Sequence, residues 1–343
     1  MNKKRSKTGV LLVNLGTPDS YKTSDVRKYL REFLMDARVI DIPFISRWML
    51  VNLIIAPFRA PKSAKVYKKL WKERGSPLMF YGVDLKNIIQ DNLPDVVVEL
   101  AMRYQNPSIE AGLKKLQAQH VSQIIVVPLF PQYASATSGS VIEKCSTIIN
   151  TWQVVPKLIF VDKFFDQPGF IDALADIAQP YLELNQYDYF VFSYHGIPER
   201  QILKASRDNY CKLNDKCCSV YHTKNEFCYR AQCFETSRLL AEKLQIPKDK
   251  YAVAFQSRLG KDPWILPYTD ELLKTLPEKG IKRVLAFSPA FVADCLETTI
   301  EVGEEFKELF LEAGGEQWDL VNSLNVHPSW VEFLTAYIKK IVE

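Results

Sequence analysis

The chain has 343 residues and a mass of 39.5 kDa, enough for two domains of about 150 residues, each with its own hydrophobic core. Hydrophobic residues make up 47% and charged residues 24%, which excludes a largely disordered chain and a small disulfide-stapled protein. The net charge of +4 is too small to predict nucleic acid as the main partner.

In the first half of the chain, apolar runs alternate with amphipathic segments. The runs are almost continuously apolar, which is typical of strands covered on both faces. They predict strands over 9–16, 96–104, 123–133 and 158–164. Helical periodicity predicts helices over 24–36, 62–73, 108–120 and 138–152.

An apolar block covers 42–58. Its charge-free part, between Arg47 and Arg59, is 11 residues long, against roughly 20 needed to span a bilayer. The block could lie on a membrane surface, flanked by basic residues, or it could be a buried helix or the rim of a pocket. The amino terminus has no apolar run long enough for a secretory signal, so a cytoplasmic protein is expected, either free or peripheral at the inner membrane.

The second half repeats the pattern of the first. Strands are predicted over 189–194, 252–257, 283–292 and 319–324, and helices over 168–184, 230–244, 297–312 and 328–342. Two consecutive α/β domains, each with a parallel β-sheet flanked by helices, accommodate this alternation. The predicted domains are 1–165, which includes the apolar block, and 166–343, which includes a cysteine loop at 211–233 and the C-terminal helix.

Ligands of open parallel sheets bind beyond the carboxyl ends of the strands, and a cleft between two such domains is the expected site. His195 follows one predicted strand and Glu297 follows another. Glu301 lies four residues after Glu297, on the same helix face, where stacked carboxylates repel each other unless they hold protons or meet a cation. Each residue alone could be structural or solvated, but together they predict a proton or metal relay.

Aromatic and basic residues near other strand ends could bind a large planar ligand with carboxylates. Trp264 and Tyr133 offer flat surfaces, and Arg59 or Arg103 offers a guanidinium fork that matches a carboxylate. Each of these residues could equally be ordinary packing. Neither of the glycine-rich patterns that cradle phosphates, GxGxxG and GxxxxGK[ST], occurs in the chain.

Five of the seven cysteines lie between Cys211 and Cys233, spaced C-x5-C-C-x9-C-x4-C. In a reducing compartment this clustering indicates metal or cluster binding more than disulfides. The uneven spacing favours an iron–sulfur cluster over a zinc site, although buried cysteines without a ligand remain an alternative. Cys233 is the reserve candidate, because it falls inside a predicted helix. The chosen ligands are Cys211, Cys217, Cys218 and Cys228.

Taken together, the motifs closely resemble those of the ferrochelatase family over nearly the whole chain. The matching segments occur in the family's order: LLVNLGTPDS, RAPKSAKVYKKLWKERGSPL, MRYQNP, PLFPQYASATSGS, FSYHGIPER, FQSRLGKDPWILPYTDE and FVADCLETTIE. The resemblance implies two Rossmann-like domains of the chelatase fold. It also implies a lyase that inserts its substrate Fe²⁺ into protoporphyrin IX, giving protohaem and two protons.

The resemblance also implies roles for single residues. His195 matches the family's active-site histidine and Glu297 the carboxylate facing it, as catalytic and iron-binding groups; Glu301 matches the next acid of the inner carboxylate row. Positions that line the porphyrin pocket or hold its propionates are matched by Arg59, Tyr67, Arg103, Tyr133 and Trp264. The cysteine loop resembles that of bacterial members with a [2Fe-2S] cluster, and the apolar block resembles a lip that some members use at membranes.

At two positions this chain has a residue that differs from the one found in some members of the family. Leu15 stands where members acting on coproporphyrin often carry Tyr, which favours protoporphyrin as the substrate. Cys295 stands where some members have His, so it is either a variant ligand or a packed residue. Coproporphyrin III ferrochelatase and a non-catalytic tetrapyrrole or metal carrier remain the alternative functions. The oligomeric state does not follow from the sequence.

Overall fold

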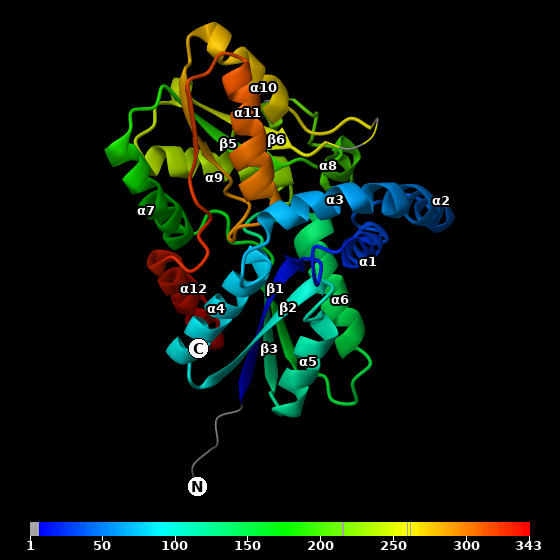
Figure 1. Cartoon of the computed structure of the whole chain (residues 1–343). Coiled ribbons are helices and arrows are strands. Elements are labelled where there is room, and N and C mark those ends of the chain that lie inside the picture. The colour runs from blue at the N-terminus through cyan, green and yellow to red at the C-terminus, as the bar shows by residue number, and fades with distance from the viewer. Residues whose placement is uncertain (1–6, 215, 259, 261) are drawn as a thin grey trace. The chain divides into compact units, whose positions relative to one another are not determined.

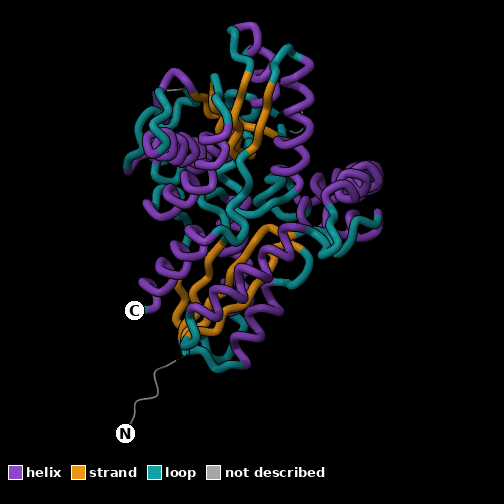
Figure 2. Tube along the Cα trace, turned by 60° about the vertical axis from the view of Figure 1, so that its left-hand side comes forward, coloured by secondary structure: helices purple, strands orange, loops and turns teal. Residues whose placement is uncertain are grey.

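The computed structural model describes residues 7–214, 216–258, 260 and 262–343, and the chain forms two compact units. The first unit comprises the described residues up to Phe130 together with 135–163 and 334–343. The second comprises 131–134 and 164–333. Each unit contains one four-stranded, fully parallel sheet flanked by helices (Figures 1 and 2). The predicted α/β fold with two parallel sheets is therefore confirmed.

The sheet of the first unit has the strand order β2-β1-β3-β4. Its strands are β1 (Thr8–Gly16), β2 (Val96–Tyr104), β3 (Gln123–Pro128) and β4 (Lys157–Phe160). The helices, π-helices included, are α1 (Thr23–Leu34), α2 (Phe44–Met49), η1 (Leu50–Ile55), α3 (Ala56–Leu70), α4 (Pro77–Asn92), α5 (Ile109–Ala118), η2 (Ser135–Gly139) and α6 (Ser140–Ile149). β1 is a central strand that pairs with both β2 and β3, and its apolar run is buried on both faces because helices such as α4 and α5 pack against it.

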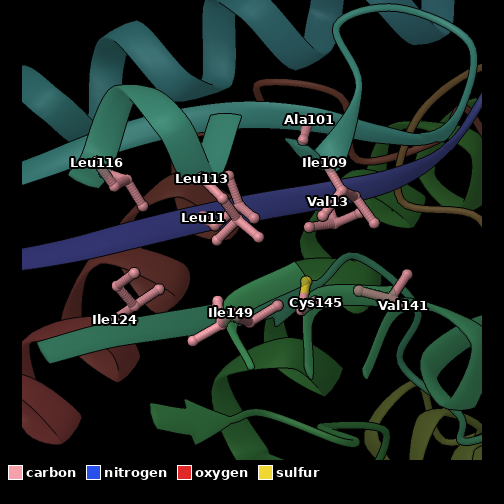
Figure 3. Packing of buried hydrophobic residues seen from close by; sticks show 11 residues of the cluster. Leu11, Val13, Ala101, Ile109, Leu113, Leu116, Ile124, Val141, Cys145 and Ile149 are labelled. Atoms are coloured by element: carbon pink, nitrogen blue, oxygen red, sulfur yellow. The ribbon is translucent and has the colours of Figure 1, made fainter. Parts of the chain in front are cut away.

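On one face of this sheet, β1 packs against α5 and α6. Leu11 and Val13 of β1 share a fully buried cluster with Leu113 of α5 and Cys145 of α6 (Figure 3). Gly112 lets α5 approach closely, because a Cβ there would lie 2.7 Å from Cδ1 of Leu11. This packing fixes the carboxyl end of β1, where Leu15 is the next-to-last residue of the strand.

The second unit has the strand order β6-β5-β7-β8, the same topology as the first. Its strands are β5 (Tyr189–His195), β6 (Tyr251–Gln256), β7 (Arg283–Phe287) and β8 (Gln317–Leu320). Its longer helices are α7 (Pro168–Leu184), α8 (Glu199–Ala205), α9 (Tyr229–Lys243), α10 (Thr269–Thr275), the π-helix η7 (Glu297–Glu305), α11 (Phe306–Glu312) and α12 (Pro328–Val342). The last residues of α12, from Leu334, cluster with the first unit, unlike the predicted range 166–343.

Several strands are shorter at their carboxyl ends than predicted. β3 ends at Pro128 rather than 133, and β7 ends at Phe287 rather than 292. The apolar residues beyond them are still buried, as Leu129 and Val292 show, but in loops. Apolarity in these segments therefore reports burial and not strand pairing. The helix predicted over 297–312 is a π-helix followed by an α-helix, with the amide of Phe306 bonded to the carbonyl of Glu301 five residues earlier.

The apolar block folds as α2, η1 and the start of α3. Within the described part of the chain, no helix is both long and apolar enough to cross a membrane. The block's exposed side chains include Phe44, Ile45, Leu53, Ile54 and Phe58, between 57% and 73% accessible. Arg47 does not belong to the basic flank, because its guanidinium is buried and donates to the carbonyls of Ile40 and Ile42.

Candidate active site and cysteine loop

His195 is the last residue of β5 and lies next to Gln256, the last residue of β6. Its Nδ1 is 2.6 Å from the carbonyl oxygen of Gly196, which leaves Nε2 as the nitrogen that can face a substrate. The Trp264 ring lies beside the imidazole, with ring centroids 6.3 Å apart. Trp264 is held there by a β-bridge to Pro198, so one loop positions both side chains.

Glu301 is the most constrained acid of the site. Both of its carboxylate oxygens lie within 2.8 Å of the Ser257 hydroxyl, and Nε2 of Gln256 donates to it at 3.1 Å. Burial raises the pKa of Glu301 above its usual value; the Ser257 hydrogen bond and the charge of His195 lower it, and the charge of Glu297 raises it. Glu301 therefore interacts electrostatically with both His195 and Glu297, and the structure brings these three side chains together.

The hydrogen bonds that hold Glu301 continue into the sheet. The Ser193 hydroxyl in β5 lies 2.6 Å from Oε1 of Gln256, which orients the amide so that its NH₂ faces Glu301. Glu297 begins η7, and its carbonyl oxygen is 3.5 Å from the same NH₂. Cys295 is buried just before η7, and burial raises the pKa of its thiol well above the usual value, which makes it a packed, protonated residue in this structure.

Four predicted porphyrin contacts belong to the first unit. Leu15 is half-buried at the end of β1, Arg59 is exposed on α3, and Tyr67 is buried on α3 against the Tyr29 ring. Arg103 is largely internal: Nη2 pairs with Asp36 at 2.6 Å, and Nε donates to the Ser140 hydroxyl at 2.6 Å. A propionate bound by Arg103 would have to compete with Asp36, which leaves Arg59 as the more accessible guanidinium.

Asp36 carries a lowered pKa. Burial by itself would raise it, but hydrogen bonds from Ser140 and from the backbone amide of Arg38, together with the charge of Arg103, outweigh that effect. The pair is therefore ionised and structural at neutral pH. The fifth candidate, Tyr133, belongs to the second unit, where its amide donates to Oε1 of Gln232 at 2.7 Å.

The four chosen cysteines lie together in the second unit. Cys217 and Cys218 have their Sγ atoms 3.8 Å apart, and a small cavity is lined by Cys211, Cys217 and Cys228 with Ser206, Tyr210 and Asn225. The Cys218 thiol donates a hydrogen bond to Cys228, which raises the pKa of Cys218 and lowers that of Cys228. Cys228 also receives amide hydrogen bonds at the start of α9, a setting that stabilises a thiolate.

Cys233 lies one turn further along α9. It is fully buried, and its thiol interacts with the Tyr229 hydroxyl. Over the described ranges, no three side chains of His, Cys, Asp or Glu are arranged as a finished metal site. The cysteines therefore meet in pairs and around a cavity and do not form a closed mononuclear cage.

Several residues that support the site were not among the predicted site residues. Gln256 and Ser257 hold Glu301, and Tyr229 donates from α9 to the backbone carbonyl of His195 at 2.9 Å. The sequence signal for the first two was their place at the carboxyl end of a strand. Tyr229 has no such signal, because its partner is a backbone atom 34 residues away.

The fold is that of the chelatases. A solved structure of SirB from Bacillus subtilis with Fe³⁺ is similar, with a TM-score of 0.53 and 13% identity, covering 97% of this chain and 95% of that chain. The sirohydrochlorin chelatase SirB from Bacillus subtilis subspecies spizizenii, in complex with cobalt, has a TM-score of 0.55 at 11% identity, covering 97% and 94%. At this identity the likeness concerns the fold alone.

Sequence similarity identifies the family within that class. The family model described as Ferrochelatase matches residues 7–341. A ferrochelatase of Coxiella burnetii (strain Dugway 5J108-111) is 45% identical, covering 99% of this chain and 96% of its own. One of Legionella pneumophila (strain Paris) is also 45% identical, covering 97% and 98%. The chain belongs to the ferrochelatase family, as its motifs predicted.

Proposed function

We propose that this protein is a lyase that inserts Fe²⁺ into protoporphyrin IX, giving protohaem and two protons. The observation that carries the proposal is the group of His195, Glu297 and Glu301 at the carboxyl ends of β5 and β7, in a member of the ferrochelatase family. Leu15 at the end of β1 supports the vinyl-bearing substrate over coproporphyrin III. Fe²⁺ and the porphyrin are substrates here, and neither is a resident cofactor.

The reaction needs a base, a path for charge and a fixed ring. Two pyrrole N–H protons must leave, and Fe²⁺ must exchange water for nitrogen ligands. Nε2 of His195 can accept one proton, because Nδ1 is already engaged with a carbonyl. Glu301, whose pKa is raised, can take up a proton and pass it on through the acids of η7. Trp264 beside His195 supplies a flat surface for a macrocycle.

His195→Ala tests the catalytic role. We expect it to abolish insertion of zinc or iron while porphyrin binding, followed by porphyrin fluorescence, is retained. If insertion continues unchanged, His195 has no part in the mechanism. Assaying protoporphyrin against coproporphyrin with the unaltered protein separates the two ferrochelatase alternatives, and porphyrin binding without any insertion would identify a carrier.

We further propose that the cysteine loop binds a [2Fe-2S] cluster through Cys211, Cys217, Cys218 and Cys228. Two thiolates on one tetrahedral metal at about 2.3 Å lie roughly 3.8 Å apart, and Cys217 and Cys218 have that separation. The cavity beside Cys211 and Cys228 and the lowered pKa of Cys228 also support a thiolate-ligated group. When bound, the cluster supplies a redox-active anchor for the loop.

Iron analysis and absorption spectroscopy of the purified protein test the cluster. We expect a red-brown protein with sulfur-to-iron charge-transfer bands and about two irons per chain. Cys211→Ser should remove the colour, whereas Cys145→Ser, which changes a cysteine buried in the first unit, should keep it. A colourless protein with one bound zinc would replace the cluster by the zinc alternative.

We also propose a cytoplasmic location with peripheral contact to the inner membrane. Seven cysteines without a disulfide support a reducing compartment. The exposed side chains of α2, η1 and α3, next to Arg59, Lys62 and Lys65, support contact with an anionic lipid surface.

A further inference from the structure

The first turn of α9 connects the part of the cysteine loop that precedes it, 211–228, to the candidate active site. Cys228, one of the proposed cluster ligands, is the residue at which α9 is capped, and Tyr229 begins the helix. Tyr229, Arg230 and Gln232 follow within one turn, and all three are buried. Each bonds to a different part of the candidate site, although none of them was selected from the sequence.

Tyr229 reaches the catalytic strand directly. Its hydroxyl donates to the carbonyl oxygen of His195 at 2.9 Å, while its backbone adjoins Cys228. The His195 carbonyl is part of the peptide that leads into Gly196, whose carbonyl in turn contacts Nδ1 of His195. The Tyr229 hydrogen bond therefore bears on the orientation of this peptide and of the imidazole beside it.

Arg230 and Gln232 each hold the cysteine loop with one group and the candidate site with another. Arg230 donates to the carbonyl of Asn214 in the loop, and through Nε to the carbonyl of Leu266, two residues after Trp264. Gln232 donates to the carbonyl of Glu226 in the loop and accepts from the amide of Tyr133. A shift of the loop would therefore displace Arg230 and Gln232, and with them the segments that carry Trp264 and Tyr133.

We propose that the first turn of α9 is a bracket through which the cysteine loop positions His195, Trp264 and Tyr133, with Tyr229, Arg230 and Gln232 as positioning residues. This proposal rests on the proposed roles of His195 in catalysis, of Trp264 and Tyr133 as porphyrin contacts, and of the loop as a cluster site. Through the bracket, binding of the cluster in the loop controls the affinity for porphyrin. It also controls how readily the backbone amides around His195 exchange with solvent. No electron transfer and no covalent step are involved.

Tyr229→Phe tests the bracket, because it removes the hydroxyl and keeps the ring. We expect the affinity for metal-free porphyrin to fall on the order of tenfold, because one buried hydrogen bond is lost. Amide hydrogen exchange over 193–197 should accelerate, while iron content and cluster absorption stay unchanged. Tyr187→Phe is the matched control, because its hydroxyl bonds to Asp319, away from the loop, and it should change neither porphyrin affinity nor exchange at 193–197.

A double-variant comparison tests the link to the loop itself. Cys211→Ser, by removing the cluster, should weaken porphyrin binding more in the unaltered background than in Tyr229→Phe, where only the Arg230 and Gln232 connections remain. Additive effects of the two substitutions, or unchanged exchange and affinity in Tyr229→Phe, would overturn the bracket. Neither readout depends on turnover, so a protein that binds porphyrin but inserts no metal would overturn the proposed function and leave the bracket measurable.

Discussion

Ser257 shows how a single residue can tune the candidate site. Its φ of 66° lies in the left-handed region, which non-glycine residues seldom occupy. This backbone turns the hydroxyl toward both oxygens of Glu301. The strain is therefore located where a hydrogen bond to the carboxylate is formed, and that bond opposes the rise in pKa caused by burial.

Ser257→Ala should raise the pKa of Glu301 further, because the ionised carboxylate loses a donor while burial persists. Ionisation then requires a higher pH, so the acid limb of the zinc-insertion profile should move up by about one pH unit. Ser257→Gly, which relieves the backbone strain, should give the same shift. Ser329→Ala removes a serine from another carboxylate, Asp176, and should leave the profile unchanged; an unmoved limb in the Ser257 variants would separate Glu301 from the reaction.

At the residue scale, the sequence located the chemistry better than it located the support. The positions of His195 and Glu297 after strands, and the cysteine spacing, predicted groups that the structure brings together. The Tyr229 bond could not be predicted, because a backbone carbonyl as acceptor leaves no residue pattern. The Arg103–Asp36 ion pair could not be predicted either, because Asp36 lies just after a helix and not at the end of a strand.

At the scale of elements, the starts of the strands were easier to predict than their ends. Strand pairing ends where a loop begins, but the first residues of these loops are still buried. The apolar run in the sequence therefore continues past the last paired residue. The segment that forms the π-helix η7 was predicted as a helix, but its type could not be predicted, because acids spaced by four share a face in a helix of either type. Its five-residue hydrogen bonds become visible only in the structure.

The pair of Asp36 and Arg103 joins three parts of the first unit: the segment just after α1, β2 and, through Ser140, the start of α6. Asp36→Asn should lower the free energy of unfolding by about 3 kcal/mol, because it leaves the Arg103 charge buried without compensation. Asp84→Asn breaks the more exposed Arg74 pair, which solvent screens, and should lower the free energy of unfolding far less. Urea denaturation measures both.

The same pair predicts a dependence of stability on pH. The folded-state pKa of Asp36 lies below the ordinary value of 3.8, so its contribution is present above that pH and is lost as the pH falls through the lowered pKa. Asp36→Asn should therefore reduce the stability difference between neutral and acid pH. Equal losses at both would show that the pair is not ionised.

At the scale of the molecule, the exposed apolar side chains of α2, η1 and α3 form the surface proposed to contact membranes. Phe58→Ser should reduce sedimentation with phosphatidylglycerol vesicles by about tenfold, because a side chain that is 73% exposed can insert into the interface. Leu184→Ser, at an 80% exposed position in the second unit, should have no effect. Equal effects of the two, or none from Phe58→Ser, would argue against this surface.

The assignment of 131–134 to the second unit and of 334–343 to the first has a practical consequence for dissection. A cut after Lys163 would leave the N-terminal fragment without 334–343, the last turns of α12. It would leave the C-terminal fragment without Tyr133, whose amide donates a hydrogen bond to Gln232. Neither half of the gene product would then carry its full complement of packing. To separate the two units, 131–134 would have to be joined to the second unit and 334–343 to the first, because a single cut in the chain cannot do this.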